Sequence, residues 1–279
     1  MSVVAELSIL DSLDYKQINF SYDSSRNTAN IAFNPTGRPC FNPELLKELD
    51  AAQQLLKNEA INPSHLIVTS AIKGVFSFGG DLNLFIKHIR SKNRQALHAY
   101  MKLCIDVLMS TSYLYNLEKV AVVQGAAFGG GFEAALSCST IIAEKSAQFG
   151  FPERLFNLFP GMGAYSYLIR RVSPNVARRI VSCERKKYSA EELYDLGVVD
   201  ILVDDGMGKD AAAEYVRHQQ QYANGYNAIR AVTDYYHKVN HTELHDIGER
   251  WVKAALELSE RDMRFMEIVE KGQNKYFNL

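Results

Sequence analysis

Long hydrophobic runs are absent from this 279-residue sequence, in which no apolar run approaches the about 18 residues that a membrane-spanning helix needs. An excess of one charge is also absent, because 31 Lys and Arg residues stand against 32 Asp and Glu residues and leave a net charge of -1. These absences weigh against insertion into a membrane and against attraction of the whole chain to nucleic acid. With 47% hydrophobic and 23% charged residues, the composition is typical of a soluble globular protein.

Cysteine is scarce and unpaired in the sequence. The four cysteines are Cys40, Cys104, Cys138 and Cys183. They show no CxxC spacing and mostly have apolar neighbours, which predicts reduced, packed thiols rather than disulfides or a zinc site. The N-terminal segment has acidic residues within its apolar run and lacks a basic region and a cleavage site, so we expect a cytoplasmic protein.

The short motifs of several enzyme classes are missing. The chain has no GxGxxG or GxxxxGK[ST] motif, which disfavours binding of a dinucleotide or of nucleotide phosphates. It has no GxSxG motif, which disfavours a serine hydrolase. The histidines, among them His218, His237, His241 and His245, lack the HExxH spacing of a zinc site. We therefore expect no metal and no cofactor.

Short apolar runs alternate with helical patterns over the first two thirds of the chain. Strands are predicted at residues 15–22, 30–33, 66–70, 119–125 and 140–144, and helices at residues 43–58 and 93–115. Beyond Gly206 nearly everything is helical, with Ile247, Trp251, Ala254 and Leu258 in one stripe. This order predicts an α/β fold on a partly parallel sheet, with a core over residues 1–206 and a helical C-terminal extension over residues 207–279.

Two glycine-rich segments follow predicted strands. The segment "GAAFGGGFE" ends at Glu133 and precedes a helix predicted to begin near Phe132, and "FSFGGDL" contains Gly80. Amides at a helix start have no intrahelical acceptor, and without side chains nearby they can approach a ligand oxygen closely. Amides from the two segments could together bind a developing oxyanion. The alternative is that these glycines only allow close packing.

Two carboxylates stand out as acid and base candidates. Glu133 lies in the first turn of the predicted helix, where the dipole and nearby amides favour an ionised base. Glu153 lies in the apolar run "FGFPERLFNLFPGMG", where burial would raise its pKa and keep a proton available. The alternatives are a helix-dipole partner for Glu133 and a surface or ion-paired residue, beside Arg154, for Glu153. Sequence leaves open which glutamate is acid or base in each step.

With these residues in place, the sequence resembles the crotonase (enoyl-CoA hydratase/isomerase) superfamily over residues 66–203. The family's F-x-x-G-x-D-[IL] loop matches "FSFGGDL" and implies an oxyanion amide at Gly80. Its "GxxxGGGxE" element matches "GAAFGGGFE" and implies the second amide at Gly130 and a catalytic glutamate at Glu133. Its second glutamate stands 20 positions later, which matches Glu153. The resemblance implies the crotonase-like ββα spiral core.

The sequence departs from common hydratases after the second glutamate, where "FPGMGAYSYLIRR" replaces a "PGxGGTQRL"-like segment. This segment and "GGGFEAALSCSTIIAE" are similar to diffusible signal factor synthases of the RpfF type. That resemblance implies dehydration of a 3-hydroxyacyl thioester on acyl carrier protein to the cis-2-enoyl thioester, followed by thioester hydrolysis. An ordinary enoyl-CoA hydratase and a non-catalytic acyl-thioester binding protein are the alternatives, and retention of both glutamates argues against the second.

Partners follow from charge and from the resemblance. A basic cluster that could receive the acidic carrier protein comprises Arg170, Arg171, Arg178, Arg179, Arg185, Lys186 and Lys187. Its alternative is a set of solvated helix faces and ion pairs. The resemblance implies a homo-oligomer, a trimer or a hexamer, and a receiver domain of a sensor kinase as a further partner.

Overall fold

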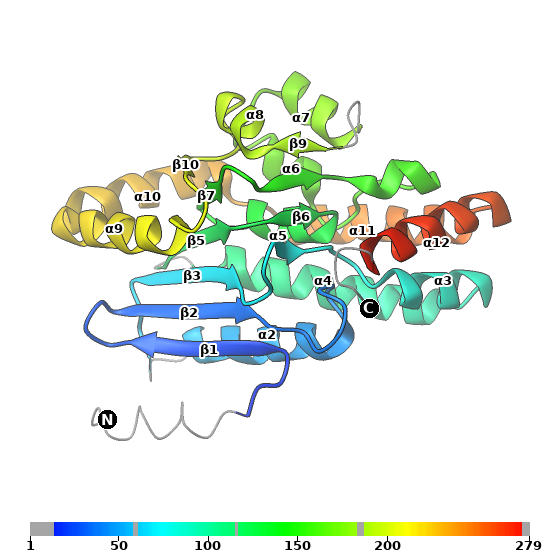
Figure 1. Ribbon diagram of the computed structural model, residues 1–279, viewed down its shortest axis with the longest axis horizontal. Helices are drawn as coiled ribbons and strands as arrows, with labels where there is room; N and C mark the ends of the chain where they lie inside the picture. The colour runs from blue at the N-terminus through cyan, green and yellow to red at the C-terminus, as the bar shows by residue number, and fades with distance from the viewer. Residues whose placement is uncertain (1–13, 58–60, 115–116, 183–186, 275–279) are drawn as a thin grey trace.

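A six-stranded sheet forms the centre of the fold (Figure 1). The computed structural model describes residues 14–57, 61–114, 117–182 and 187–274, so Cys183, Arg185 and Lys186 lie outside it. The strand order is β1-β2-β3-β5-β7-β10, and only the pair of β1 and β2 is antiparallel. The strands are β1 (Ile18–Asp23), β2 (Thr28–Phe33), β3 (His65–Ser70), β5 (Glu118–Val123), β7 (Thr140–Glu144) and β10 (Ile201–Val203).

A second sheet of short strands stands beside the first. Its order is β4-β6-β8-β9, formed by β4 (Val75–Ser77), β6 (Ala126–Phe128), β8 (Gln148–Gly150) and β9 (Tyr188–Ser189). Each of β3, β5 and β7 in the large sheet is followed along the chain by a short strand of the small sheet and then by a helix. This repetition is the ββα spiral that the sequence resemblance implied.

Helices occupy both faces of the large sheet and the C-terminal third of the described chain. They are α2 (Pro43–Lys57), α3 (Leu82–Arg90), α4 (Arg94–Ser112), α5 (Gly130–Leu136), the 3-10 helix η1 (Pro152–Phe156), α6 (Ala164–Leu168), α7 (Pro174–Val181), α8 (Ala190–Asp195), α9 (Gly208–Gln221), α10 (Ala223–His237), α11 (His241–Leu256) and α12 (Glu260–Asn274). In the described part of the chain, no helix is both long and apolar enough to cross a membrane.

The large sheet is covered by different helices on its two faces. Helix α9 packs on one face, where Val120, Val122 and Ile142 contact Ala212 and Val216. The main core fills the opposite side, between the sheet and helices α2, α4 and α5. All residues of β3, β5 and β7 are buried, which explains why the apolar residues of each strand are consecutive rather than alternating. The candidate site lies on the α4 and α5 side.

The structure corrects some expected element boundaries. The loop predicted after β3 contains the short strand β4 and leads into α3, which the sequence analysis did not predict. Asp81 of the "FSFGGDL" motif caps α3, since its side chain accepts hydrogen bonds from the amides of Asn83 and Leu84. Helix α5 begins at Gly130 rather than near Phe132. The Gly130 amide is therefore the first of the helix and has no intrahelical acceptor.

Candidate active site

The two glycine loops meet in space. A Cβ placed on Gly79 would lie 2.5 Å from the Gly130 nitrogen, and a Cβ placed on Gly130 would lie 3.4 Å from the Gly80 nitrogen. Among the hydrogen bonds of the described residues, neither the Gly80 nor the Gly130 amide donates to a protein acceptor. Two unpaired N–H groups from separate loops therefore stand next to one another, as a site for a single oxyanion requires.

Glycine is required at both ends of the run of three glycines, because a side chain there would clash with a neighbouring segment. Gly129 has φ +52°, and a Cβ there would lie 2.6 Å from Oε1 of Glu153. A Cβ on Gly131 would lie 2.3 Å from the carbonyl oxygen of Ser77 in β4. Side chains at these positions would thus push away either the second glutamate or the small sheet. The same glycines allow close packing of the backbone and leave the Gly130 amide without a side chain over it. The packing interpretation and the oxyanion interpretation from sequence therefore do not exclude each other.

Glu133 lies in the first turn of α5, and its side chain is buried, with 1% of the residue's surface exposed. Its Oε1 accepts hydrogen bonds from the amides of Met162 at 2.9 Å and Ala164 at 3.0 Å. Burial raises the pKa of Glu133 to about 7, although these two amides lower it. The sequence argument for its pKa was therefore wrong: burial outweighs the helix terminus, and the amides that stabilise the carboxylate come from the loop before α6.

Glu153 lies in η1, and its Oε1 packs directly against Gly129. Burial, and then the charge of Glu133, raise the pKa of Glu153 to about 8. Its Oε2 is shielded from solvent and has no hydrogen-bond partner among the described residues. Arg154 donates to the carbonyl of Ser182 instead, so the ion pair considered from sequence is not formed. The structure thus brings together all four predicted residues: Gly80, Gly130, Glu133 and Glu153.

Tyr100 on α4 positions the first glycine loop. Its buried hydroxyl donates to the carbonyl of Phe41 and accepts from the amide of Asp81 at 3.3 Å. Phe41 in turn donates its amide to the carbonyl of Gly79 at 2.7 Å. Sequence reasoning missed Tyr100 because it lies 20 residues after Gly80 on a helix whose apolar stripe indicated only core packing.

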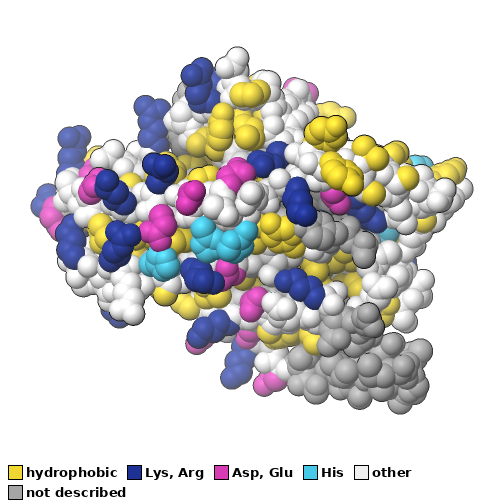
Figure 2. Space-filling model, turned by 180° about the vertical axis from the view of Figure 1, so that it is seen from behind, with side chains coloured by type: hydrophobic (Ala, Val, Ile, Leu, Met, Phe, Trp, Pro, Cys, Tyr) yellow, Lys and Arg dark blue, Asp and Glu magenta, His cyan; other side chains and the backbone are white. Residues whose placement is uncertain are grey.

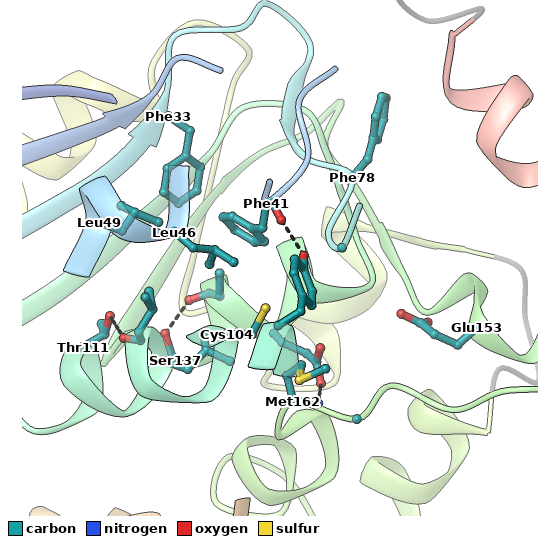
Figure 3. A pocket seen from close by; sticks show the side chains of 18 of the residues that line it. Phe33, Phe41, Leu46, Leu49, Phe78, Cys104, Thr111, Ser137, Glu153 and Met162 are labelled. Carbon is teal, nitrogen blue, oxygen red and sulfur yellow. Dashed lines mark hydrogen bonds between the residues drawn. The ribbon is translucent and has the colours of Figure 1, made fainter. Parts of the chain in front are cut away.

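An elongated, mostly apolar pocket extends from the glutamates into the protein (Figure 3). Figure 3 shows Glu153 and Thr111 on opposite sides of the view, with Phe41 and Cys104 between them. Trp251 of α11 also lines the pocket and packs against Phe85, with ring centroids 4.9 Å apart. An apolar tunnel that leads away from two acids and an oxyanion site is suited to a fatty acyl chain.

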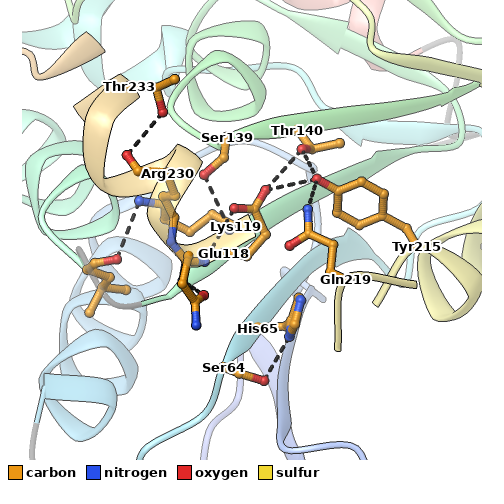
Figure 4. Close-up of polar contacts among 12 residues, drawn as sticks. Ser64, His65, Glu118, Lys119, Ser139, Thr140, Tyr215, Gln219, Arg230 and Thr233 are labelled. Carbon is orange, nitrogen blue, oxygen red and sulfur yellow. Dashed lines mark hydrogen bonds and ion pairs between the residues drawn. The ribbon is translucent and has the colours of Figure 1, made fainter. Parts of the chain in front are cut away.

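A second buried polar cluster lies outside this pocket and has a structural role (Figure 4). Glu118 accepts hydrogen bonds from Thr140 at 3.0 Å and from Tyr215 at 3.2 Å, and it faces Arg230 at 3.5 Å. The neighbouring Lys119 has its pKa lowered by burial and contacts backbone carbonyls. These contacts connect α9 and α10 to β5 and β7. The buried charges of Glu118 and Lys119 thus both have polar partners within the protein.

Other predicted groups are only partly available to a ligand. In the basic cluster, Arg170 pairs with Glu243 and Arg171 pairs with Asp200, as the ion-pair alternative expected, whereas Arg178 is exposed. Among the described residues no histidine lines the pocket. His241 and His245 instead lie near Asp106 on the outer side of α4, with ligand atoms within 4.8 Å of one another. The cysteines described, Cys40, Cys104 and Cys138, are buried free thiols.

Known proteins are similar to this chain in sequence. A sequence model described as enoyl-CoA hydratase/isomerase matches residues 24–276. The chain is 30% identical over 181 residues to the probable mitochondrial enoyl-CoA hydratase 2 of Arabidopsis thaliana, with 64% of this chain and 58% of the relative covered. It is 34% identical over 193 residues to a fatty acid oxidation complex subunit alpha of a Psychrobacter species, with 68% of this chain and 26% of the relative covered. The chain thus spans less than two thirds of the length of these relatives.

Solved structures show the same fold. A structure of Pseudomonas aeruginosa DspI is 26% identical, with a TM-score of 0.68, 80% of this chain and 81% of that chain covered. The human mitochondrial delta3-delta2-enoyl-CoA isomerase is 16% identical, with a TM-score of 0.78, 94% of this chain and 100% of that chain covered. The second likeness supports the fold alone.

Proposed function

Because the chain belongs to the enoyl-CoA hydratase/isomerase family, we propose that it dehydrates a 3-hydroxyacyl thioester to the cis-2-enoyl thioester and then hydrolyses the thioester. The product is a free cis-2-unsaturated fatty acid of the diffusible signal factor type. The observation that carries the proposal is the meeting of the Gly80 and Gly130 amides beside Glu133 and Glu153 in the lining of a mostly apolar pocket.

In the dehydration step, the thioester carbonyl oxygen accepts hydrogen bonds from the Gly80 and Gly130 amides. Glu133 removes the C2 proton, and Glu153 donates its proton to the 3-hydroxyl group, which leaves as water while the C2–C3 double bond forms. The amide hydrogen bonds stabilise the negative charge that develops on the carbonyl oxygen.

In the hydrolysis step, the same amides stabilise the tetrahedral intermediate. A glutamate activates the attacking water, a bond forms between its oxygen and C1, and the C1–S bond breaks to release a thiol and the free acid. One pocket therefore serves both steps.

The different surroundings of the glutamates support their separate roles. Glu133 carries two amide hydrogen bonds that stabilise its carboxylate, whereas the shielded Oε2 of Glu153 has no protein partner in the described chain. Burial raises both pKa values, and the charge of Glu133 raises that of Glu153 further. Because the two amides favour the carboxylate form of Glu133, we assign Glu133 as the base and Glu153 as the acid in dehydration.

We expect a bell-shaped pH profile for the dehydration step. Activity falls below pH about 7 because Glu133 becomes protonated, and it falls above pH about 8 because Glu153 loses its proton. The profile is measured as kcat/KM against pH with a 3-hydroxyacyl thioester, because kcat/KM reports the titration of groups in the free enzyme. A rate that stays constant from pH 4.5, the ordinary carboxyl pKa, to pH about 8 would contradict the assignment of Glu133 as base.

The function itself is tested by product analysis. The pure protein is incubated with the same 3-hydroxyacyl group on acyl carrier protein and on CoA, and the products are separated by mass and double-bond geometry. We expect free cis-2-enoic acid, formed faster from the carrier protein thioester. Formation of only the trans-2-enoyl thioester, with no free acid, would contradict the proposal and support the second candidate.

That second candidate is an ordinary enoyl-CoA hydratase. The curated relatives named above favour it, because they are described as a hydratase and as part of a fatty acid oxidation complex. The same glutamates would then act on a CoA thioester without hydrolysis. Carrier protein docking on the exposed Arg178 side of α7 and binding of a receiver domain remain predictions.

Self-association is the last part of the proposal. None of the residues of α10 is buried, and Ile229, Val232, Tyr235 and Tyr236 are each more than half exposed. Figure 2 shows apolar side chains at the end of the molecule that α9 and α10 form in Figure 1. An apolar helix face of this kind suits another copy of the chain, and a homotrimer or hexamer remains the prediction.

A further inference from the structure

A buried polar pair lines the acyl tunnel, and its Thr111 lies on the side of the view opposite Glu153 in Figure 3. Gln53 of α2 donates from Nε2 to Oγ1 of Thr111 on α4, at 2.7 Å, and the Thr111 hydroxyl donates to the Val107 carbonyl at 3.1 Å. Both side chains line the tunnel and are buried, with 3% and 7% exposure. The hydrogen bond joins two helices whose side chains line the tunnel, α2 and α4.

Gln53 has hydrogen-bonding capacity that the protein does not use. Its Oε1 is shielded from solvent and has no partner among the described residues, whereas the tunnel around it is lined by aliphatic side chains such as Leu46, Leu49 and Leu108. An acyl chain that reached this atom would press methylene groups against an acceptor that they cannot satisfy. Buried acceptors without a donor are unfavourable, so the pair opposes longer chains by polarity as well as by bulk.

We propose that Gln53, held by Thr111, is the floor of the acyl tunnel and sets the longest acyl chain that the protein accepts; this inference rests on the proposed function of the same pocket. Tyr100 marks the thioester end, because a Cβ on Gly80 would lie 3.7 Å from its hydroxyl. From Tyr100 to Thr111, α4 rises by about 16 Å, which corresponds to about twelve carbons of an extended chain at about 1.3 Å per carbon. The substrate class is therefore a medium-length 3-hydroxyacyl thioester.

The test measures binding rather than turnover. Straight-chain fatty acids of about eight to about sixteen carbons are titrated into wild-type protein and variants by calorimetry. We expect wild-type affinity to rise with chain length up to about twelve carbons and to fall by about tenfold beyond that length. Gln53→Ala removes the side-chain atoms beyond Cβ, so the length at which affinity falls should increase by about two carbons.

Two further variants test whether the length limit depends on the bulk of the side chain at position 53. Gln53→Leu keeps the bulk but removes the unsatisfied acceptor, so the length limit stays where it is in the wild type and the fall in affinity beyond it becomes shallower. Gln54→Ala changes the neighbouring exposed glutamine, which contacts Asp50, and should leave the whole length profile unchanged. The inference is overturned if wild type shows no length limit, if Gln53→Ala leaves the limit in place, or if Gln53→Leu moves it as far as Gln53→Ala does. A failure of the proposed function is recognised separately, as an intact length limit without release of enoic acid.

Discussion

Replacing Glu133 with glutamine is expected to lower kcat for dehydration by about 10²- to 10⁴-fold. The amide side chain has nearly the same size and can still accept the hydrogen bonds from Met162 and Ala164 through its oxygen, but it cannot take up the C2 proton. Substrate binding should therefore change little. Single-turnover kinetics with a 3-hydroxyacyl thioester, together with a direct binding measurement, separate the two effects.

Glu144→Gln is the matched control for this prediction. Glu144 is also buried and also accepts a backbone hydrogen bond, from Gly208 at 3.1 Å, but it does not line the pocket. Its replacement should leave kcat within about threefold of wild type, because it removes a buried charge without touching the site. A Glu133→Gln variant that kept more than about a tenth of wild-type turnover would rule out Glu133 as the base.

The raised pKa values also predict how the glutamates affect stability. A carboxyl group whose pKa is raised on folding binds its proton more tightly in the folded chain, so its contribution favours folding at low pH. That contribution is lost as pH rises from the ordinary pKa of 4.5 to about 7 for Glu133 and to about 8 for Glu153. Above pH about 8 the glutamine variants should therefore be at least as stable as wild type in denaturant unfolding, which shows that lost activity is not lost folding.

The sequence predicted the reacting groups of the site better than the surrounding residues that determine their pKa values. Glycine runs after buried strands placed Gly80 and Gly130, because a strand followed by exposed amides is a local feature that one segment contains. Glu133 and Glu153 stood out by their surroundings, and the resemblance to the crotonase superfamily implied the Gly130 amide and the 20-residue spacing of the two glutamates. The reason for the pKa of Glu133 was not recognisable, because its burial depends on the loop at Met162 and Ala164, about 30 residues away.

The missed elements have a common physical cause. Strands β4, β6 and β8 have only three residues each, too few for an alternating pattern to be recognised. They are stabilised by pairing with one another in the small sheet, a contact between distant segments. Tyr100 and Gln53 belong to helices whose patterns indicated only a core face, and their roles come from what each side chain meets across the tunnel. Local patterns therefore predict the reacting groups, whereas the tunnel is a property of packing.

Replacing Gly79 with alanine is expected to lower kcat/KM by about 10²- to 10³-fold by separating the two oxyanion loops. The added Cβ would lie 2.5 Å from the Gly130 nitrogen and 2.6 Å from the Phe128 carbonyl oxygen, and both are backbone atoms that cannot rotate away. One loop must shift, and a shift of the Gly130 amide removes a hydrogen bond that strengthens in the transition state. The variant leaves both glutamates in place, so it tests the amides alone.

Gly37→Ala separates this effect from backbone strain. Gly37 has φ +90° and Gly79 has φ +85°, so alanine meets the same unfavourable left-handed conformation at both positions. A Cβ on Gly37 has no neighbour within 4 Å, however, so only the strain of about 1–2 kcal/mol remains. Gly79→Ala should lose at least as much stability as Gly37→Ala in denaturant unfolding, because the clash adds to the shared backbone strain, and only Gly79→Ala should lose activity. If kcat/KM of Gly79→Ala stayed within about threefold of Gly37→Ala, close approach of the two loops would not be needed for catalysis, and the oxyanion role of the Gly80 and Gly130 amides would be wrong.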